Sequence, residues 1–104
     1  MKVDIKTGDG TAVAVLAGEI DHHNAKDIRS QLDRYIISVQ PSELAIDFRN
    51  VSFMDSSGIG LIMGRYKLMK ECGGTLVVCN PQPYIKRVFK LSGIERLVRI
   101  AGDK

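Results

Sequence analysis

One short segment near the middle of the chain concentrates the residues that could do chemistry. It reads Asp55-Ser56-Ser57-Gly58-Ile59-Gly60, with a carboxylate beside two hydroxyls and two glycines close behind. An apolar run with helical spacing follows, so the segment stands where a helix should begin. Serines at such a position can cap the helix, act as a nucleophile, bind phosphate or accept a phosphoryl group.

Capping is the simplest of these uses. Asp55, Ser56 or Ser57 can accept a hydrogen bond from a first-turn amide, which contributes about 1 kcal/mol, and we expect Ser56 to be the cap. One side chain is enough for this purpose, yet three polar ones stand in a row. Gly58 and Gly60 would each cost about 1 kcal/mol relative to alanine inside a helix. We therefore expect the glycines to keep the backbone accessible to a partner.

Catalysis and a nucleotide-type phosphate loop both fit the spacing poorly. A nucleophile elbow needs glycine two residues before and after its serine, whereas Ser56 has Met54 and Ser57 has Asp55 at the first of these positions. The glycines match neither G-x-G-x-x-G nor GxxxxGK[ST], although a small phosphate can still bind at a helix start. We predict no catalytic residue.

The only histidines, His22 and His23, are adjacent. A catalytic triad would need one of them beside a serine, with an acid to orient it. Two neighbouring histidines without a third obvious ligand do not make a metal site, so we predict no bound metal.

The fourth use is that one of the serines accepts a phosphoryl group. A phosphoserine brings about −1.5 to −2 charges, and a helix N-terminus tolerates such charge because free amides and the helix dipole face it. On either serine the charge would lie beside Asp55. If the segment before the first predicted helix is a neighbour, the charge would also lie near Glu19 and Asp21. A partner docked there would meet repulsion and a desolvation cost.

The composition indicates one small globular domain over residues 1–104. The chain is 44% hydrophobic and carries a net charge of +3, which divides into −2 for residues 1–52 (six bases, eight acids) and +5 for residues 53–104 (nine bases, four acids). Neither an apolar run of roughly eighteen residues nor a signal peptide occurs. We expect a cytoplasmic protein without a membrane segment. Cys72 and Cys79 are expected to be reduced structural thiols, because their spacing fits neither a zinc pair nor a redox motif.

Alternating patterns predict the elements that must position the serines. Residues 3–6 and 12–17 read as strands joined by a Gly-Asp-Gly turn at 8–10. A helix with inward positions 25, 28, 32, 35, 36 and 39 follows and ends before Pro41.

The second half alternates strands with helices. Strands are predicted at 44–48, 75–79 and 98–100. Between them lie two helices whose inward residues are Ile59, Ile62, Tyr66 and Met69, and then Ile85, Val88 and Phe89 after Pro83. The pattern predicts an α/β sandwich, with a mixed sheet of four to five strands and helices mainly on one face. The strand order stays open.

The segment from Phe53 to Gly60, with Gly64-Arg65-Tyr66 after it and Gly18-Glu19-Ile20-Asp21 before it, closely resembles the STAS-domain anti-sigma factor antagonists of bacteria. The resemblance extends over essentially the whole chain and is greatest to the sporulation antagonists of endospore-forming bacteria. It implies a STAS-type sandwich and a switch that has no catalytic activity and no cofactor of its own.

The resemblance also implies the partners. When unphosphorylated, such antagonists bind an anti-sigma factor that is also a serine kinase, and so free its sigma factor. The kinase uses ATP and magnesium to phosphorylate the second serine of the motif, here Ser57, and a PP2C-type phosphatase reverses this. The alternative is a general stress-type antagonist, or a STAS scaffold module that binds a different kinase.

We expect the partner to contact residues around Ser57 and in an adjoining loop. Asp21 could instead only cap the helix after it, and Ile59 could belong to the core. Acidic residues in the interface would meet basic groups of the partner. The exposed bases of the last helix are expected to be a solvated face rather than a nucleic-acid site, since no aromatic stacking platform accompanies them. The expected contact residues are Glu19, Asp21, His22, Asp55, Ser56, Gly58, Ile59 and Gly60.

Overall fold

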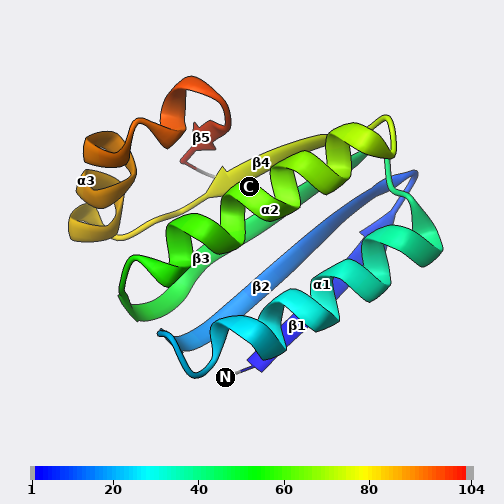
Figure 1. Ribbon diagram of the computed structural model, residues 1–104. Helices are drawn as coiled ribbons and strands as arrows, with labels where there is room; N and C mark the ends of the chain where they lie inside the picture. The colour runs from blue at the N-terminus through cyan, green and yellow to red at the C-terminus, as the bar shows by residue number, and fades with distance from the viewer. Residues whose placement is uncertain (1, 103–104) are drawn as a thin grey trace.

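The computed structural model describes residues 2–102 of the chain, which form one sheet and its helices (Figure 1). In chain order the elements are β1 (Lys2–Gly8), β2 (Thr11–Ile20), α1 (Ala25–Val39), β3 (Glu43–Met54), α2 (Ser57–Glu71), β4 (Thr75–Cys79), α3 (Pro83–Ser92), the 3₁₀ turn η1 (Ile94–Arg96) and β5 (Arg99–Ala101).

The strands lie in the sheet in their order along the chain, β1-β2-β3-β4-β5. Only the β1–β2 hairpin is antiparallel, and its turn places Asp9 and Gly10 at φ values of 40° and 82°, as the Gly-Asp-Gly sequence predicts. The later pairs are parallel, so each connection crosses over through helical structure. Right-handed crossovers that always step in the same direction place their helices on the same face. Figure 1 shows α1 and α2 side by side over the sheet, which confirms the predicted α/β sandwich.

The core lies between this sheet face and the helices. Leu44, Ile46 and Phe48 alternate inward from β3. Ala45, on the other face of the strand, is buried in a second, smaller cluster with Val77 and Cys79. The Phe48 ring meets the Phe89 ring of α3 edge to face, with centroids 5.3 Å apart. Of the predicted inward face of α1, Ile28, Leu32 and Ile36 are buried, Ala25 and Tyr35 are half-buried, and Val39 is 53% exposed. Val39 is the last residue of α1 and lies beside the β1–β2 turn, where solvent reaches it.

Two predictions about the middle of the chain are corrected. β3 does not end at residue 48 but continues to Met54. In α2 the buried residues include Leu61 and Arg65, whereas Ile59 and Tyr66 are only half-buried. The reason is that α2 packs against α1 as well as against the sheet, so its buried stripe is turned toward α1.

The cysteines and the bases of the last helix lie as the sequence predicts. Cys72 is half-buried and Cys79 is buried. Lys86, Arg87 and Lys90 are exposed on α3. Within residues 2–102, no helix is long and apolar enough to cross a membrane.

Candidate functional site

Asp55 joins the two segments that the sequence places around the serines. Its Oδ1 accepts a hydrogen bond from the Ser57 amide at 2.8 Å, and its Oδ2 accepts one from the His22 amide at 3.2 Å. The Asp55 amide donates to the Ile20 carbonyl at 3.0 Å. The loop before α1 and the start of α2 are therefore neighbours, as expected.

These contacts favour the charged form of Asp55. The hydrogen bond from the Ser57 amide is the largest cause that lowers the pKa of this carboxyl, against a smaller opposing effect of burial. The Ser57 hydroxyl, the His22 amide and the charge of the His22 ring lower the pKa further. Asp55 is thus a carboxylate at neutral pH, placed against the hydroxyl and amide of Ser57.

The prediction that Ser56 caps α2 is wrong. Ser56 precedes α2 with helical backbone angles, φ −61° and ψ −19°, and its side chain makes no capping hydrogen bond. A capping side chain usually needs an extended backbone to reach back over the first turn. Asp55, one residue earlier, binds the Ser57 amide instead. Ser56 is left exposed, while Ser57 is half-buried at the helix start.

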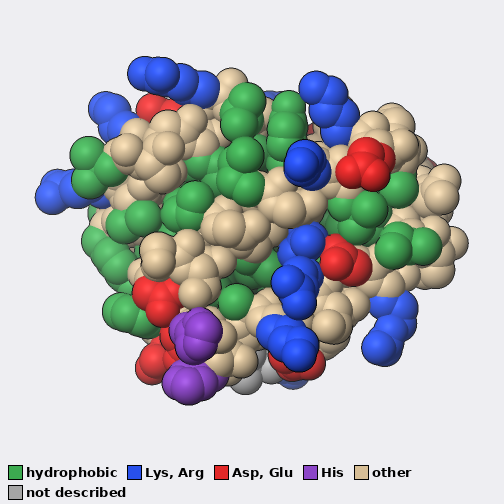
Figure 2. Space-filling view, viewed as in Figure 1, with side chains coloured by type: hydrophobic (Ala, Val, Ile, Leu, Met, Phe, Trp, Pro, Cys, Tyr) green, Lys and Arg blue, Asp and Glu red, His purple; other side chains and the backbone are tan. Residues whose placement is uncertain are grey.

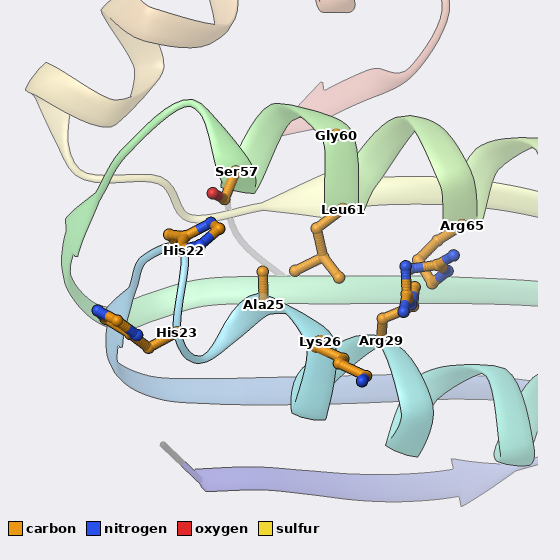
Figure 3. Close-up of a pocket in the computed structure, with 9 residues that line it drawn as sticks. All are labelled: His22, His23, Ala25, Lys26, Arg29, Ser57, Gly60, Leu61 and Arg65. Atoms are coloured by element: carbon orange, nitrogen blue, oxygen red, sulfur yellow. The ribbon is translucent and has the colours of Figure 1, made fainter.

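The loop before α1 differs in part from the expectation. Glu19 does not belong to it but lies in β2, exposed and paired in register with Phe53. Asp21 is half-buried, and its Oδ1 accepts hydrogen bonds from the amides of His23 and Asn24, both at 2.9 Å. Asp21 therefore binds amides of the turn that leads into α1, and not amides of the helix itself, which begins at Ala25 without a side-chain cap. His22 is exposed and turns its ring toward Ser57 (Figure 3).

The two glycines of the motif, Gly58 and Gly60, lie in different surroundings. Gly58 is buried, and a Cβ there would lie 2.3 Å from both Cγ and Sδ of Met54. Its missing side chain makes room for Met54, which corrects the expectation that Gly58 keeps the backbone open to a partner. Gly60 is exposed, and a Cβ there would meet nothing within 4 Å. Ile59 is half-buried and packs against the core.

Tyr84, from the first turn of α3, supports the same end of β3. Its hydroxyl accepts a hydrogen bond from the Met54 amide and donates one to the Ser52 carbonyl, both at 3.1 Å. Phe53 beside it is 45% exposed. The strand end that carries the serines is thus held from α3 as well as from β2.

On its other side Ser57 opens onto a groove between α1 and α2, with a volume of about 680 Å³ (Figure 3). Five of its lining residues carry basic side chains, and no Asp or Glu is among the described residues that line it. Figure 2 shows this face, with acidic side chains to the left of the two histidines and several Lys and Arg side chains, with acidic ones among them, to the right. The lining residues are His22, His23, Ala25, Lys26, Arg29, Ser57, Gly60, Leu61 and Arg65.

Arg65 is the functional candidate that the sequence did not reveal. It is only 6% exposed, and its Nε lies 2.7 Å from Asp33 Oδ1. This ion pair lacks hydrogen-bond geometry, so neither Nε nor Nη1 of Arg65 has a hydrogen-bond partner among the described residues. Burial lowers the pKa of Arg65, Asp33 opposes this, and Arg29 adds to the lowering. The only signal in the sequence was the Gly64-Arg65-Tyr66 triplet of the resemblance.

Metal binding has no support in the described part of the chain, where no three His, Cys, Asp or Glu residues gather in a group that could hold an ion.

Comparisons with known proteins agree on one family. The sequence model of the STAS domain matches residues 2–103. An anti-sigma F factor antagonist of Paenibacillus polymyxa is 35% identical over 104 residues, covering 100% of this chain and 89% of that protein. An anti-sigma-B factor antagonist of Bacillus subtilis (strain 168) is 32% identical over 102 residues, covering 98% and 92%.

Solved structures agree with the sequences. The anti-sigma factor antagonist SpoIIAA in its unphosphorylated form superposes with a TM-score of 0.85 at 30% identity, covering 99% of this chain and 89% of that one. The phosphorylated form of SpoIIAA from Bacillus superposes with a TM-score of 0.77 at 30% identity, covering 99% and 92%. The fold around Ser57 is therefore shared with a protein that has been solved in both states.

Proposed function

The chain belongs to the STAS domain family, and from this premise we propose that it is an anti-sigma factor antagonist controlled by phosphorylation of Ser57. Unphosphorylated, it binds an anti-sigma factor that is also a serine kinase, and so releases the sigma factor. Phosphorylation ends this binding, and a PP2C-type phosphatase restores it. The protein is a regulator and a substrate, not an enzyme. It acts in the cytoplasm, in sporulation, as a single STAS domain.

The placement of Ser57 is the observation that carries this proposal. Its amide is bound by Asp55, and its side chain lies at the end of an open groove at the N-terminus of α2. The helix dipole at this end stabilises an added phosphoryl charge, so the fold survives the modification. The same charge lies beside the Asp55 carboxylate. A partner that covers Ser57 would have to desolvate both anions, which weakens docking.

The comparisons support the same mechanism. SpoIIAA, 30% identical over nearly the whole chain, is known in a phosphorylated and an unphosphorylated form. The exposed residues that surround Ser57 are the proposed contacts of the kinase. They are Glu19, His22, Ser56 and Gly60, with the edge of the half-buried Ile59.

A second candidate is a general stress-type antagonist, or a STAS scaffold module that binds a different kinase. The 32% identity to the anti-sigma-B factor antagonist of Bacillus subtilis favours it. The two candidates differ in the partner: a sporulation antagonist binds the anti-sigma factor of a sporulation sigma factor, and a stress-type antagonist binds that of a stress sigma factor. Parallel binding assays with both kinases of the same organism would separate them.

The test is phosphorylation by the anti-sigma factor kinase with magnesium and ATP, read by intact mass and peptide mapping. We expect one phosphoryl group on Ser57, none on Ser57→Ala, and full modification of the matched control Ser56→Ala. Ser57→Ala should still bind the kinase, whereas Ser57→Asp should bind more weakly. Equal binding by Ser57→Ala and Ser57→Asp would show that charge does not operate the switch.

A further inference from the structure

The α1–α2 groove beside Ser57 is lined by basic side chains, with no Asp or Glu among the described residues that line it. Lys26 and Arg29 are exposed on successive turns of α1, and Arg65 lies opposite them on α2. Arg29 and Arg65 point toward one another across the space between the helices (Figure 3). Asp33 forms an ion pair with Arg65, but it does not line the groove. The positive charges of Arg29 and Arg65 repel one another, and an anion between them would relieve this repulsion.

Arg65 shows that the positive charge is not fully compensated within the chain. A side chain that is 94% buried should have its polar atoms paired, because an unpaired buried donor costs free energy. Its Nη1 has no hydrogen-bond partner among the described residues, and its Nε only faces Asp33. A guanidinium carries five N–H donors, and those that Asp33 does not take can bind a second carboxylate.

We infer that the groove receives an acidic side chain of the anti-sigma factor, held between Arg29 and Arg65. The inference rests on the proposed function, because that function brings a partner to Ser57, one of the residues that line the groove. A kinase that reaches the Ser57 hydroxyl covers the mouth of the groove. Charge complementarity then selects a carboxylate, and the volume of about 680 Å³ is ample for one side chain.

This contact gives the switch a second component. A phosphoryl group on Ser57 places its negative charge at the end of the groove, where it meets the incoming carboxylate and attracts the same basic residues. The modified serine thus competes with the partner for its binding site. The acids Glu19, Asp21 and Asp55 lie on the other side of Ser57 and leave the groove itself basic.

The test compares kinase binding by charge-reversed variants of the unphosphorylated, full-length protein. Arg29→Glu and Lys26→Glu should each weaken binding by about tenfold or more, since a reversed charge repels the entering carboxylate. Arg34→Glu is the matched control, because Arg34 is an exposed arginine of the same helix outside the groove, and it should bind like wild type. Circular dichroism and thermal unfolding verify that every variant is folded.

Each other outcome has a definite meaning. The inference would be overturned if Arg29→Glu and Lys26→Glu bound the kinase as tightly as Arg34→Glu, or more tightly. The proposed function would then remain intact. A wild-type chain that binds no anti-sigma factor kinase would overturn both. Inorganic phosphate is titrated by NMR as a probe. If it shifts groove amides in wild type but not in Arg29→Glu while kinase affinity is unchanged, the groove takes a free anion and not the partner.

Discussion

The two sides of Ser57 are built in opposite ways. On the strand side, Asp55, Gly58 and Tyr84 are fitted to their neighbours: the carboxylate has two amide donors, the glycine makes room for Met54, and the hydroxyl bridges two backbone groups. On the groove side, the bases line an open space, and the one buried guanidinium is incompletely paired. The two sides therefore have different roles: the strand side fixes the position of Ser57, and the groove side stays available for a partner. Substitutions on the strand side should then change stability, and those on the groove side should change binding.

The largest effect on stability is expected on the strand side, from Gly58→Ala. The new Cβ would lie 2.3 Å from Met54 Cγ and Sδ, so the side chain or the helix must shift. We expect the free energy of unfolding to fall by about 2 kcal/mol, the usual cost of overpacking a core. Urea denaturation measures this.

The matched control is Gly60→Ala, in the same turn of α2 with open space around its Cβ. Alanine there should raise the free energy of unfolding by about 0.5 to 1 kcal/mol, as helix propensity dictates. If both alanines had the same effect, Met54 would not be the reason for the glycine at position 58.

A smaller effect is expected on the groove side, from Arg65→Met. Removing one member of a fully buried ion pair costs several kcal/mol, but the Asp33 side chain is 30% exposed, so water reaches part of its carboxylate, and methionine fills the space. We expect a loss of about 1 kcal/mol in urea denaturation, together with weaker kinase binding. A loss much larger than for Gly58→Ala would mean that Arg65 serves stability and would break the comparison.

Tyr84→Phe is a milder test of the strand side. It removes the hydroxyl that accepts from Met54 and donates to Ser52, and leaves the ring in place. Because the tyrosine is 42% exposed, water can replace part of this bonding, and we expect a loss of about 0.5 kcal/mol. Kinase binding should hardly change; a large loss of binding with little loss of stability would place Tyr84 in the interface.

The smallest effect is a difference in pH dependence between wild type and Asp55→Asn. The folded-state pKa of Asp55 is lowered mainly by the Ser57 amide, so its contribution to stability is present above the unfolded pKa and is lost as pH falls through the folded value. Wild type should therefore lose more stability than Asp55→Asn between pH 6 and pH 3, by urea midpoints. Parallel pH profiles would show that the Asp55 charge does not stabilise the fold.

Sequence patterns predicted those features of the fold that depend on the periodicity of apolar residues. The hairpin, the crossover helices and the α/β class follow from alternation and from turn residues. The end of β3 was missed because Arg49, Asn50 and Ser52 are exposed and interrupt the apolar run. Arg65 was missed because a base among apolar residues is ordinarily a solvent-facing one, and only the packing of α1 on α2 buries it. The choice of Asp55 over Ser56 as the cap depends on backbone angles that no residue type reveals.

The length of β3 decides how its end is held. β4 pairs with β3 only as far as Asp47, opposite Cys79, so the strand from Phe48 to Met54 overhangs the sheet and has β2 as its one strand neighbour among the described residues. On the side that has no strand neighbour, the Tyr84 hydroxyl binds the Met54 amide and the Ser52 carbonyl at the end of β3. The serines thus follow a strand end that β2 pairs on one side and that Tyr84, in place of a neighbouring strand, holds on the other.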